Sequence, residues 1–208
     1  MTSRIVDLET WPRAAQFHFF RTYQQPHYAT TTRLDVTHLM GRKADGVSPY
    51  RACLYAIGAG LHAVPELCMR FRGNVVVAHD MVTLSMTVPT AAGSFGYAYV
   101  PFVEEFEAFD AQAKALIDAV ALGDALQANS GERDDLAYLS CMPWLDYTAI
   151  NNALPGPDDC IPRVTWGKFA QTRAGSEMAM TLEVHHALVD GAQVGAYFAA
   201  VQEALDRI

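Results

Sequence analysis

Hydrophobic and polar residues follow two different periods along this chain, and the two periods predict strands and helices in mixed order. Alternating, often β-branched residues predict strands at 30–36, 67–71, 75–78, 81–88 and 178–184, with two or three more between 137 and 170. The Arg72-Gly73-Asn74 segment between the second and third of these strands predicts a hairpin.

Apolar residues at helical spacing predict a helix opened by Thr10 and Pro12, one from Ser48 to Pro65, one from Glu104 to Leu122, and one from Ala192 to Leu205. Gly58 and Gly60 lie inside the second helix, where glycine is unfavourable and nothing in the sequence explains it. The mixture predicts an α/β fold, a two-layer sandwich of helices on a mixed β-sheet. Because no repeat or long linker interrupts it, we expect a single domain over residues 1–208.

The amino-acid composition limits the kinds of molecule that this protein is expected to bind. With 208 residues, 51% of them hydrophobic, the chain can bury one full-sized core, and a net charge of −8 argues against nucleic acid or an anionic membrane. No run reaches the roughly 18 apolar residues of a membrane span, and the N-terminus is acidic where a signal peptide would be apolar. We therefore expect a cytoplasmic protein, in which four widely spaced cysteines remain thiols: Cys53, Cys68, Cys141 and Cys160.

The strand at 178–184 runs directly into the sequence HHALVDG, residues 185–191. A histidine at the end of a strand suits general-base catalysis, because imidazole is the side chain whose pKa lies near neutrality. Successive strand residues point to opposite faces, so only one of His185 and His186 can face a given cavity. The spacing alone does not say which histidine that is.

Two other interpretations of this motif are open on the residues alone. Asp190 and Gln193 have the spacing of a capping box at the start of a helix, with the histidines as ordinary residues at a strand end. Metal binding is the third interpretation. Adjacent histidines on a strand do not easily chelate one ion, and no other His or Cys has the spacing of a ligand, so we expect no metal.

Five segments, in order, resemble the chloramphenicol acetyltransferase family of the trimeric, HHxxxDG-bearing type. They are WPRAAQF at 11–17, RLDV at 33–36, SCMPW at 140–144, TWGKF at 165–169 and VHHALVDG at 184–191. HHxxxDG also marks plant alcohol acyltransferases, carnitine acyltransferases and peptide-synthetase condensation domains, but those chains are much longer. The short length and the ordered segments favour the smaller family and its fold.

The resemblance implies a role for each matching residue. His186 would be the base that takes the proton of an acceptor hydroxyl as its oxygen attacks the thioester of acetyl-CoA, with no acyl-enzyme. Ser140 would donate to the tetrahedral oxyanion, and Thr165 would stabilise the same intermediate through water. Arg13 and Asp190 would form a buried ion pair that holds the loop after His186, which makes Asp190 structural support and not the relay of a protease triad.

The same resemblance implies that Lys168 lies near CoA and that five apolar residues line the acceptor pocket: Phe19, Phe20, Tyr28, Phe95 and Ile150. Several positions depart from the family. Pro26 and Tyr97 replace small residues, Gln193 replaces the last histidine of the longer motif HHxxxDGxH, and no family aromatic matches between Gln127 and Glu132.

Assembly is also implied by the resemblance. Family members are homotrimers with the active site between subunits, so His186 would come from one subunit while Tyr28 and the aromatic pocket come from its neighbour. The expected function is acetyl-CoA-dependent O-acetylation of chloramphenicol, without a metal. The alternatives are the same chemistry on an unknown small alcohol, an inactive scaffold trimer, and a condensation-type domain fed by a carrier protein. An inactive scaffold would have no chemical reason to keep all five residues with implied roles, which are His186, Ser140, Thr165, Arg13 and Asp190. The short length of the chain argues against a condensation-type domain.

Overall fold

The computed structural model describes residues 2–91, 93–123, 128–129, 131 and 133–208. Its strands are β1 (Ser3–Ile5), β2 (His27–Asp35), β3 (Met69–Arg72), β4 (Val75–His79), β5 (Thr83–Pro89), β6 (Phe95–Pro101), β7 (Leu136–Cys141), β8 (Arg163–Trp166), β9 (Ala170–Gln171) and β10 (Ser176–His185). Its α-helices are α1 (Ala14–Phe20), α2 (Thr37–Arg42), α3 (Pro49–Ala63), α4 (Phe106–Ala121) and α5 (Gly191–Arg207), with short 3₁₀ helices at Lys43–Asp45 and Pro65–Cys68.

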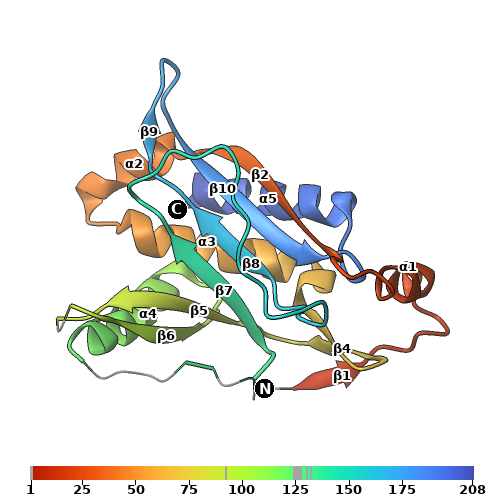
Figure 1. Cartoon of the computed structure of the whole chain (residues 1–208). Coiled ribbons are helices and arrows are strands. Elements are labelled where there is room, and N and C mark those ends of the chain that lie inside the picture. Colours follow the sequence, from red (N-terminus) through yellow and green to blue (C-terminus); the bar gives the residue numbers. More distant parts are fainter. Residues whose placement is uncertain (1, 92, 124–127, 130, 132) are drawn as a thin grey trace.

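The strands form a large and a small sheet. The large sheet has the order β2-β10-β8-β7-β5-β6, with β9 paired to β10, and the small sheet has the order β1-β4-β3 (Figure 1). In the large sheet β7 runs parallel to β5 and β8, whereas the other pairs are antiparallel. The expected architecture, helices packed on a mixed sheet, is therefore confirmed.

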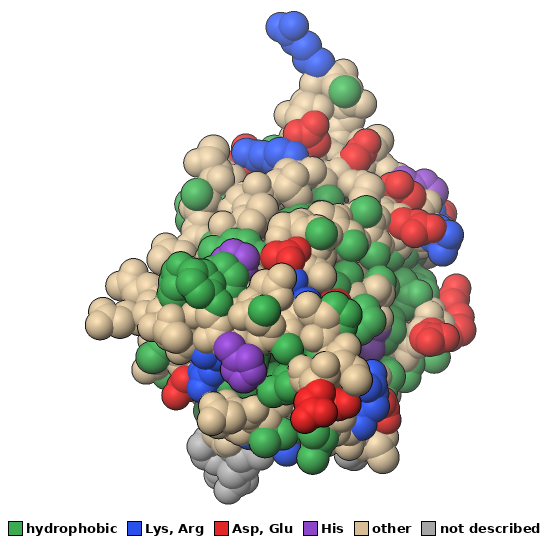
Figure 2. All heavy atoms as spheres, turned by 90° about the vertical axis from the view of Figure 1, so that its right-hand side faces the viewer, with side chains coloured by type: hydrophobic (Ala, Val, Ile, Leu, Met, Phe, Trp, Pro, Cys, Tyr) green, Lys and Arg blue, Asp and Glu red, His purple; other side chains and the backbone are tan. Residues whose placement is uncertain are grey.

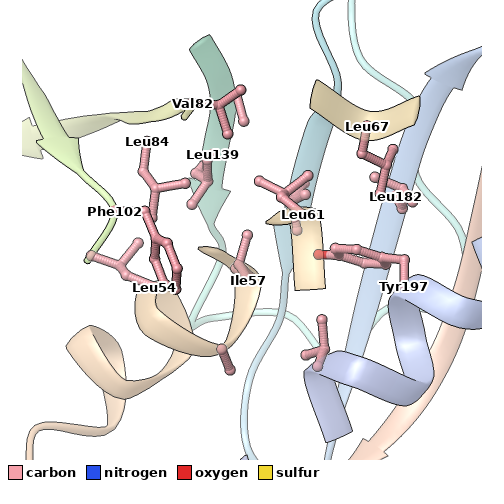
Figure 3. Packing of buried hydrophobic residues seen from close by; sticks show 14 of the residues in the cluster. Leu54, Ile57, Leu61, Leu67, Val82, Leu84, Phe102, Leu139, Leu182 and Tyr197 are labelled. Atoms are coloured by element: carbon pink, nitrogen blue, oxygen red, sulfur yellow. The ribbon is translucent and has the colours of Figure 1, made fainter. Parts of the chain in front are cut away.

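The side chains of strand β10 point alternately to the two faces of the large sheet. Met178, Met180, Leu182 and Val184 are buried. They point toward α3 and α5, where the Met180 sulfur contacts the Tyr197 hydroxyl at 3.6 Å. Figure 3 shows this core, with Leu54, Ile57 and Leu61 of α3 facing apolar side chains of the strands. The alternate residues of β10 point the other way, toward the segment 142–162 that connects β7 to β8 and runs over that face (Figure 1).

Most predicted elements are confirmed within a few residues, including the helix capped by Ser48, whose side chain accepts from the Arg51 amide. The predicted start of the first helix at Thr10 is wrong. Thr10 instead bonds to Asp7 in a turn, and α1 begins at Ala14. Strand β6 was not predicted, because its inward residues include Gly96 and Ala98, which give only a weak hydrophobic alternation.

The two glycines of α3 are explained by close packing. A Cβ atom at Gly60 would lie 2.5 Å from Cγ2 of Val201 in α5, and one at Gly58 would lie 2.4 Å from Cδ2 of Phe102. Real Cβ atoms do not approach carbon so closely, so glycine at these positions lets α3 lie against its neighbours.

We expect Gly60→Ala to lower the free energy of unfolding by about 1–3 kcal/mol, because the added methyl group overpacks the contact with α5. Gly195→Ala is the matched control, since Gly195 lies in α5 with open space around its Cα. Alanine there should stabilise the protein by up to about 1 kcal/mol through helix propensity. Urea unfolding of both variants measures the difference, and stabilisation by Gly60→Ala would contradict the packing argument.

Candidate active site

His186 lies in the turn between β10 and α5, and hydrogen bonds fix both its backbone and its ring. Its amide donates to the Pro26 carbonyl at 2.9 Å, and its Nδ1 atom lies 3.1 Å from the Val189 carbonyl oxygen. Because a carbonyl oxygen only accepts, Nδ1 carries the proton of the neutral ring. The lone pair of the imidazole is therefore on Nε2, which has no hydrogen-bond partner among the residues that the structure describes.

Aromatic side chains hold the His186 ring from two sides. The Phe20 ring stacks on it with centroids 3.8 Å apart and an interplanar angle of 10°, and the Tyr28 ring centroid lies at 4.7 Å. Phe19 and Tyr23 extend this cluster toward solvent, with Phe19 55% exposed. Figure 2 faces the α1 end of the molecule and shows hydrophobic side chains next to histidines on its surface.

His185 is placed very differently from its neighbour. It is 2% exposed, its Nε2 atom is 2.9 Å from the Pro157 carbonyl oxygen, and its Nδ1 atom accepts from the Ala187 amide at 3.1 Å. Burial lowers its pKa to about 4. With both ring nitrogens engaged, His185 fits a structural role, and His186 remains the candidate base.

Arg13 and Asp190 connect the turn after His186 to the residue before α1. The Arg13 Nη1 atom forms an ion pair with Asp190, and its Nε atom donates to the Leu188 carbonyl at 3.0 Å. Asp190 also caps α5, since its carboxylate accepts from the Ala192 amide and its own amide donates to Gln193 Oε1 at 3.1 Å. Burial raises the pKa of Asp190, but the Arg13 hydrogen bond and the other donors outweigh it and leave the pKa lowered. Capping box and ion pair are thus both present.

Ser140 and Thr165 lie side by side on β7 and β8, and Thr165 is in turn paired with Thr181 of β10. Their side chains point to the face away from the helices. Ser140 is half-buried. Thr165 is 1% exposed, and its Oγ1 atom has no hydrogen-bond partner in the described part of the chain.

One chain does not bring Ser140 and His186 together. His186 comes five residues after Thr181, and at the rise of a strand this separates it from the Ser140–Thr165 row by about 15 Å. It also lies at the side of the helices, because its neighbour Tyr28 pairs with Val184, which points into the core.

The expected pocket residues are divided between these two places. Phe19, Phe20 and Tyr28 gather around His186, whereas Ile150 lies in the segment 142–162 and Phe95 is exposed on β6, at the opposite edge of the sheet. The expectation that Tyr28 reaches His186 from a neighbouring subunit is wrong, because Tyr28 already packs on His186 of its own chain.

The remaining positions are placed as follows. Lys168 is exposed between β8 and β9, Tyr97 lies next to Phe95 with ring centroids 5.7 Å apart, and the Pro26 carbonyl holds the His186 amide. Of the segment from Gln127 to Glu132, residues 127, 130 and 132 lie outside the described residues. No cluster of three His, Cys, Asp or Glu side chains suited to a metal ion occurs in the described segments, and none of their helices is long and apolar enough to cross a membrane.

Sequence reasoning missed the contacts made by main-chain atoms and by Tyr147. The carbonyl of Val189 sets the His186 tautomer, and the Tyr147 hydroxyl donates to the Thr165 carbonyl at 2.6 Å. A carbonyl group is the same at every position of a sequence, so no residue pattern signals the first contact. The second depends on how the segment 142–162 folds back over the sheet.

We expect the free energy of unfolding to fall as the pH is lowered from 6.5 to 4. The pKa of His185 is about 4 in the folded protein against an ordinary value of 6.5, so in this range the unfolded chain binds a proton that the folded chain excludes. The loss should approach 3 kcal/mol, about the value of such a pKa difference. Urea unfolding at several pH values measures it. His185→Gln should flatten the dependence, and an equally steep dependence in His185→Gln would contradict the assignment.

Comparison with known proteins adds to this geometry. A family model described as chloramphenicol acetyltransferase matches residues 1–202. Chloramphenicol acetyltransferase 2 of Haemophilus influenzae is 24% identical over 206 residues, covering 98% of this chain and 97% of that protein. Chloramphenicol acetyltransferase 2 of Escherichia coli is 25% identical over 209 residues, with coverage of 98% and 97%.

Solved structures agree with the family match. One described as chloramphenicol acetyltransferase superposes with a TM-score of 0.90 at 26% identity, covering 98% of this chain and 100% of its own. A probable dihydrolipoamide acetyltransferase of Listeria monocytogenes has a TM-score of 0.69 at 12% identity, covering 94% of this chain and 90% of its own. The second likeness shows a shared fold.

Proposed function

Because the chain belongs to the chloramphenicol acetyltransferase family, we propose that it is an acetyltransferase that transfers the acetyl group of acetyl-CoA to the hydroxyl of a small alcohol, with chloramphenicol as the first expected acceptor. The observation that carries the proposal is the geometry of His186. Its Nδ1–H is held by the Val189 carbonyl, so the Nε2 lone pair is left free to accept a proton, next to an aromatic cluster.

His186 acts directly on the acceptor in this mechanism. Nε2 takes the proton of the acceptor hydroxyl while the oxygen attacks the thioester carbonyl, which gives a tetrahedral oxyanion and an imidazolium ring. Collapse of the intermediate breaks the carbon–sulfur bond, and the proton passes to the CoA thiolate. The products are an acetate ester and free CoA. The flat stacking of Phe20 on His186 holds the plane of the imidazole ring.

The oxyanion partners come from a second copy of the chain. Ser140 would donate to the oxyanion, and Thr165, buried beside it, would contribute through an ordered water. Since one chain separates this pair from its own His186, the complete site requires that the His186 end of one subunit meets the Ser140 face of another. We propose a homotrimer with its active sites between subunits.

The remaining residues with implied roles support the site formed by His186, Ser140 and Thr165. Arg13 and Asp190 hold the turn that carries His186, and Lys168 is exposed at the Thr165 end of β8, where it would attract CoA. Phe19, Phe20 and Tyr28 would line the acceptor pocket on the His186 side. Ile150 and Phe95 would line it from the neighbouring subunit.

Domain and compartment complete the proposal. We propose a single acetyltransferase domain over residues 1–208, at work in the cytoplasm. Support for the compartment comes from the cysteines, all four of which are free thiols, and three of which are buried.

The second candidate is the same reaction on another small alcohol, with little or no turnover of chloramphenicol. The observation that favours it is the pairing of Tyr97 with Phe95, whose rings lie 5.7 Å apart and take up space on the side of the pocket that β6 would supply. Thiol release with a panel of small alcohols separates the two candidates.

We expect His186→Ala to lower the rate of thiol release from acetyl-CoA with chloramphenicol by about 10²–10⁴-fold, the usual contribution of a general base. The assay follows free CoA in the presence and absence of the acceptor. His18→Ala, at an exposed position of α1, is the matched histidine control and should retain full activity. Near-normal turnover by a folded His186→Ala protein would remove the general-base assignment.

We expect two inactive variants to restore activity when mixed. If each site takes His186 from one copy and Ser140 from another, random reassembly of His186→Ala with Ser140→Ala subunits leaves about one quarter of the sites complete. Thiol release by the co-expressed, purified mixture measures this recovery against each variant alone. A mixture no more active than its components would mean that both residues act within one chain.

A further inference from the structure

A chain of hydroxyl groups lies on the face of the large sheet that is turned away from the helices. The Oγ1 atoms of Thr31 on β2 and Thr181 on β10 are 2.7 Å apart. The Thr181 hydroxyl donates to the Tyr147 hydroxyl at 3.2 Å, and Tyr147 donates to the main-chain carbonyl of Thr165 on β8 at 2.6 Å. Tyr147, from the segment 142–162, therefore ties three strands together at one level of the sheet.

The hydrogen bonds that link these hydroxyl groups can run in only one donor-to-acceptor direction. Because the Thr165 carbonyl can only accept, the single proton of Tyr147 is committed to it, and the phenol oxygen accepts from Thr181. The single proton of Thr181 is then committed to Tyr147, so Thr31 is the donor in its bond with Thr181. Hydrogen bonds arranged head to tail in this way strengthen one another.

Tyr147 is itself held from both sides of its segment. Arg33 on β2 forms an ion pair with Asp146 and also donates to the Tyr147 carbonyl at 3.4 Å. On the other side, the Lys168 amide donates to the Leu145 carbonyl at 2.8 Å. A Cβ atom at Gly167 would lie 2.6 Å from the Leu145 oxygen and 3.1 Å from the Tyr147 ring, so the segment lies directly against the end of β8.

The side chain of Thr165 stands in contrast to its fixed backbone. Its Oγ1 atom is buried and has no partner within the described residues, and the strand register places it beside Ser140. A buried hydroxyl without a hydrogen bond is unfavourable, so this group is suited to bond with water or a reactant that enters the site. Its position depends on β8, and β8 is held at this residue by the phenol of Tyr147.

We propose that Tyr147 is a positioning residue of the acetyl-transfer site, an inference that rests on the proposed function. Its phenol holds the Thr165 backbone, and with it the Thr165 and Ser140 hydroxyls, in the orientation that stabilises the oxyanion. Tyr147 acts through Thr165 and does not touch the reacting atoms.

Tyr147→Phe removes one oxygen atom and keeps the ring. We expect kcat for thiol release with chloramphenicol and acetyl-CoA to fall about tenfold, since small displacements of catalytic groups have large effects on rate. KM for each substrate should stay within about twofold, because no binding contact is removed. Tyr55→Phe is the matched control: its phenol donates to the Glu104 carbonyl at 2.7 Å, the same kind of bond, away from the site. It should lose comparable stability and keep its kcat.

A double-mutant cycle separates positioning from a general loss of stability. If Tyr147 acts through Thr165, Tyr147→Phe should have no further effect on kcat in a Thr165→Val background. A wild-type kcat in Tyr147→Phe, or independent and multiplicative losses in the double variant, would overturn the positioning role and leave the proposed function standing. Absence of thiol release by the wild-type protein with every acceptor would overturn the proposed function, and the positioning role with it.

Discussion

The period-two alternation of β10 is the constraint on which the rest of the structure depends. This strand is hydrogen-bonded to β2 on one side and to β8 on the other, and nearly all of its residues are buried. Its methionines and aliphatic residues complete the core against α3 and α5. Its alternate residues carry Thr181, Glu183 and His185 to the opposite face. A slip of one residue would exchange the two sets, so the apolar core also fixes the register of the hydroxyl row.

The end of β10 is held just as firmly, because several small interactions converge on residues 186–190. Leu188 and Asp190 are bonded to Arg13, Val189 accepts from His186, and Asp190 caps α5. The Arg13 side chain is buried, but that of Asp190 is 38% exposed, so solvent screens part of the attraction between the two charges. The ion pair is poor evidence for net stability. Its value lies in geometry, because it keeps the turn in the one conformation in which Val189 faces the His186 ring.

Sequence patterns predicted the elements of this fold well where side chains alone carry the signal. The Ser48 cap, the hairpin around Gly73 and the strand before HHALVDG follow directly from residue type and period. The start of α1 could not be predicted, because Asp7 competes for Thr10 and draws it into a turn. The need for glycine at position 60 could not be predicted either, because it arises from the close contact with Val201, which is far away in the sequence.

The candidate site was predictable as a set of residues but not as an arrangement. The resemblance singled out His186, Ser140 and Thr165. Nothing in their spacing says that His186 lies at the end of β10 on the helix side while the hydroxyl pair lies on the other face. Neither the partner of Tyr28 nor the contact of Tyr147 with Thr165 has a signature in the sequence. Both depend on strand register and on the path of the segment 142–162.

Under the proposed function, the opposite placement of His186 and the hydroxyl pair also limits the assemblies that can form a complete site. In the proposed site, the surface that offers His186 meets a different surface that offers Ser140, so the contact would be heterologous. A two-fold dimer formed through one self-complementary patch would need both features in that patch. Heterologous contacts either close into a ring or continue as a filament. A cyclic trimer closes after three copies, and it gives every His186 a Ser140 partner and leaves no unmatched surface.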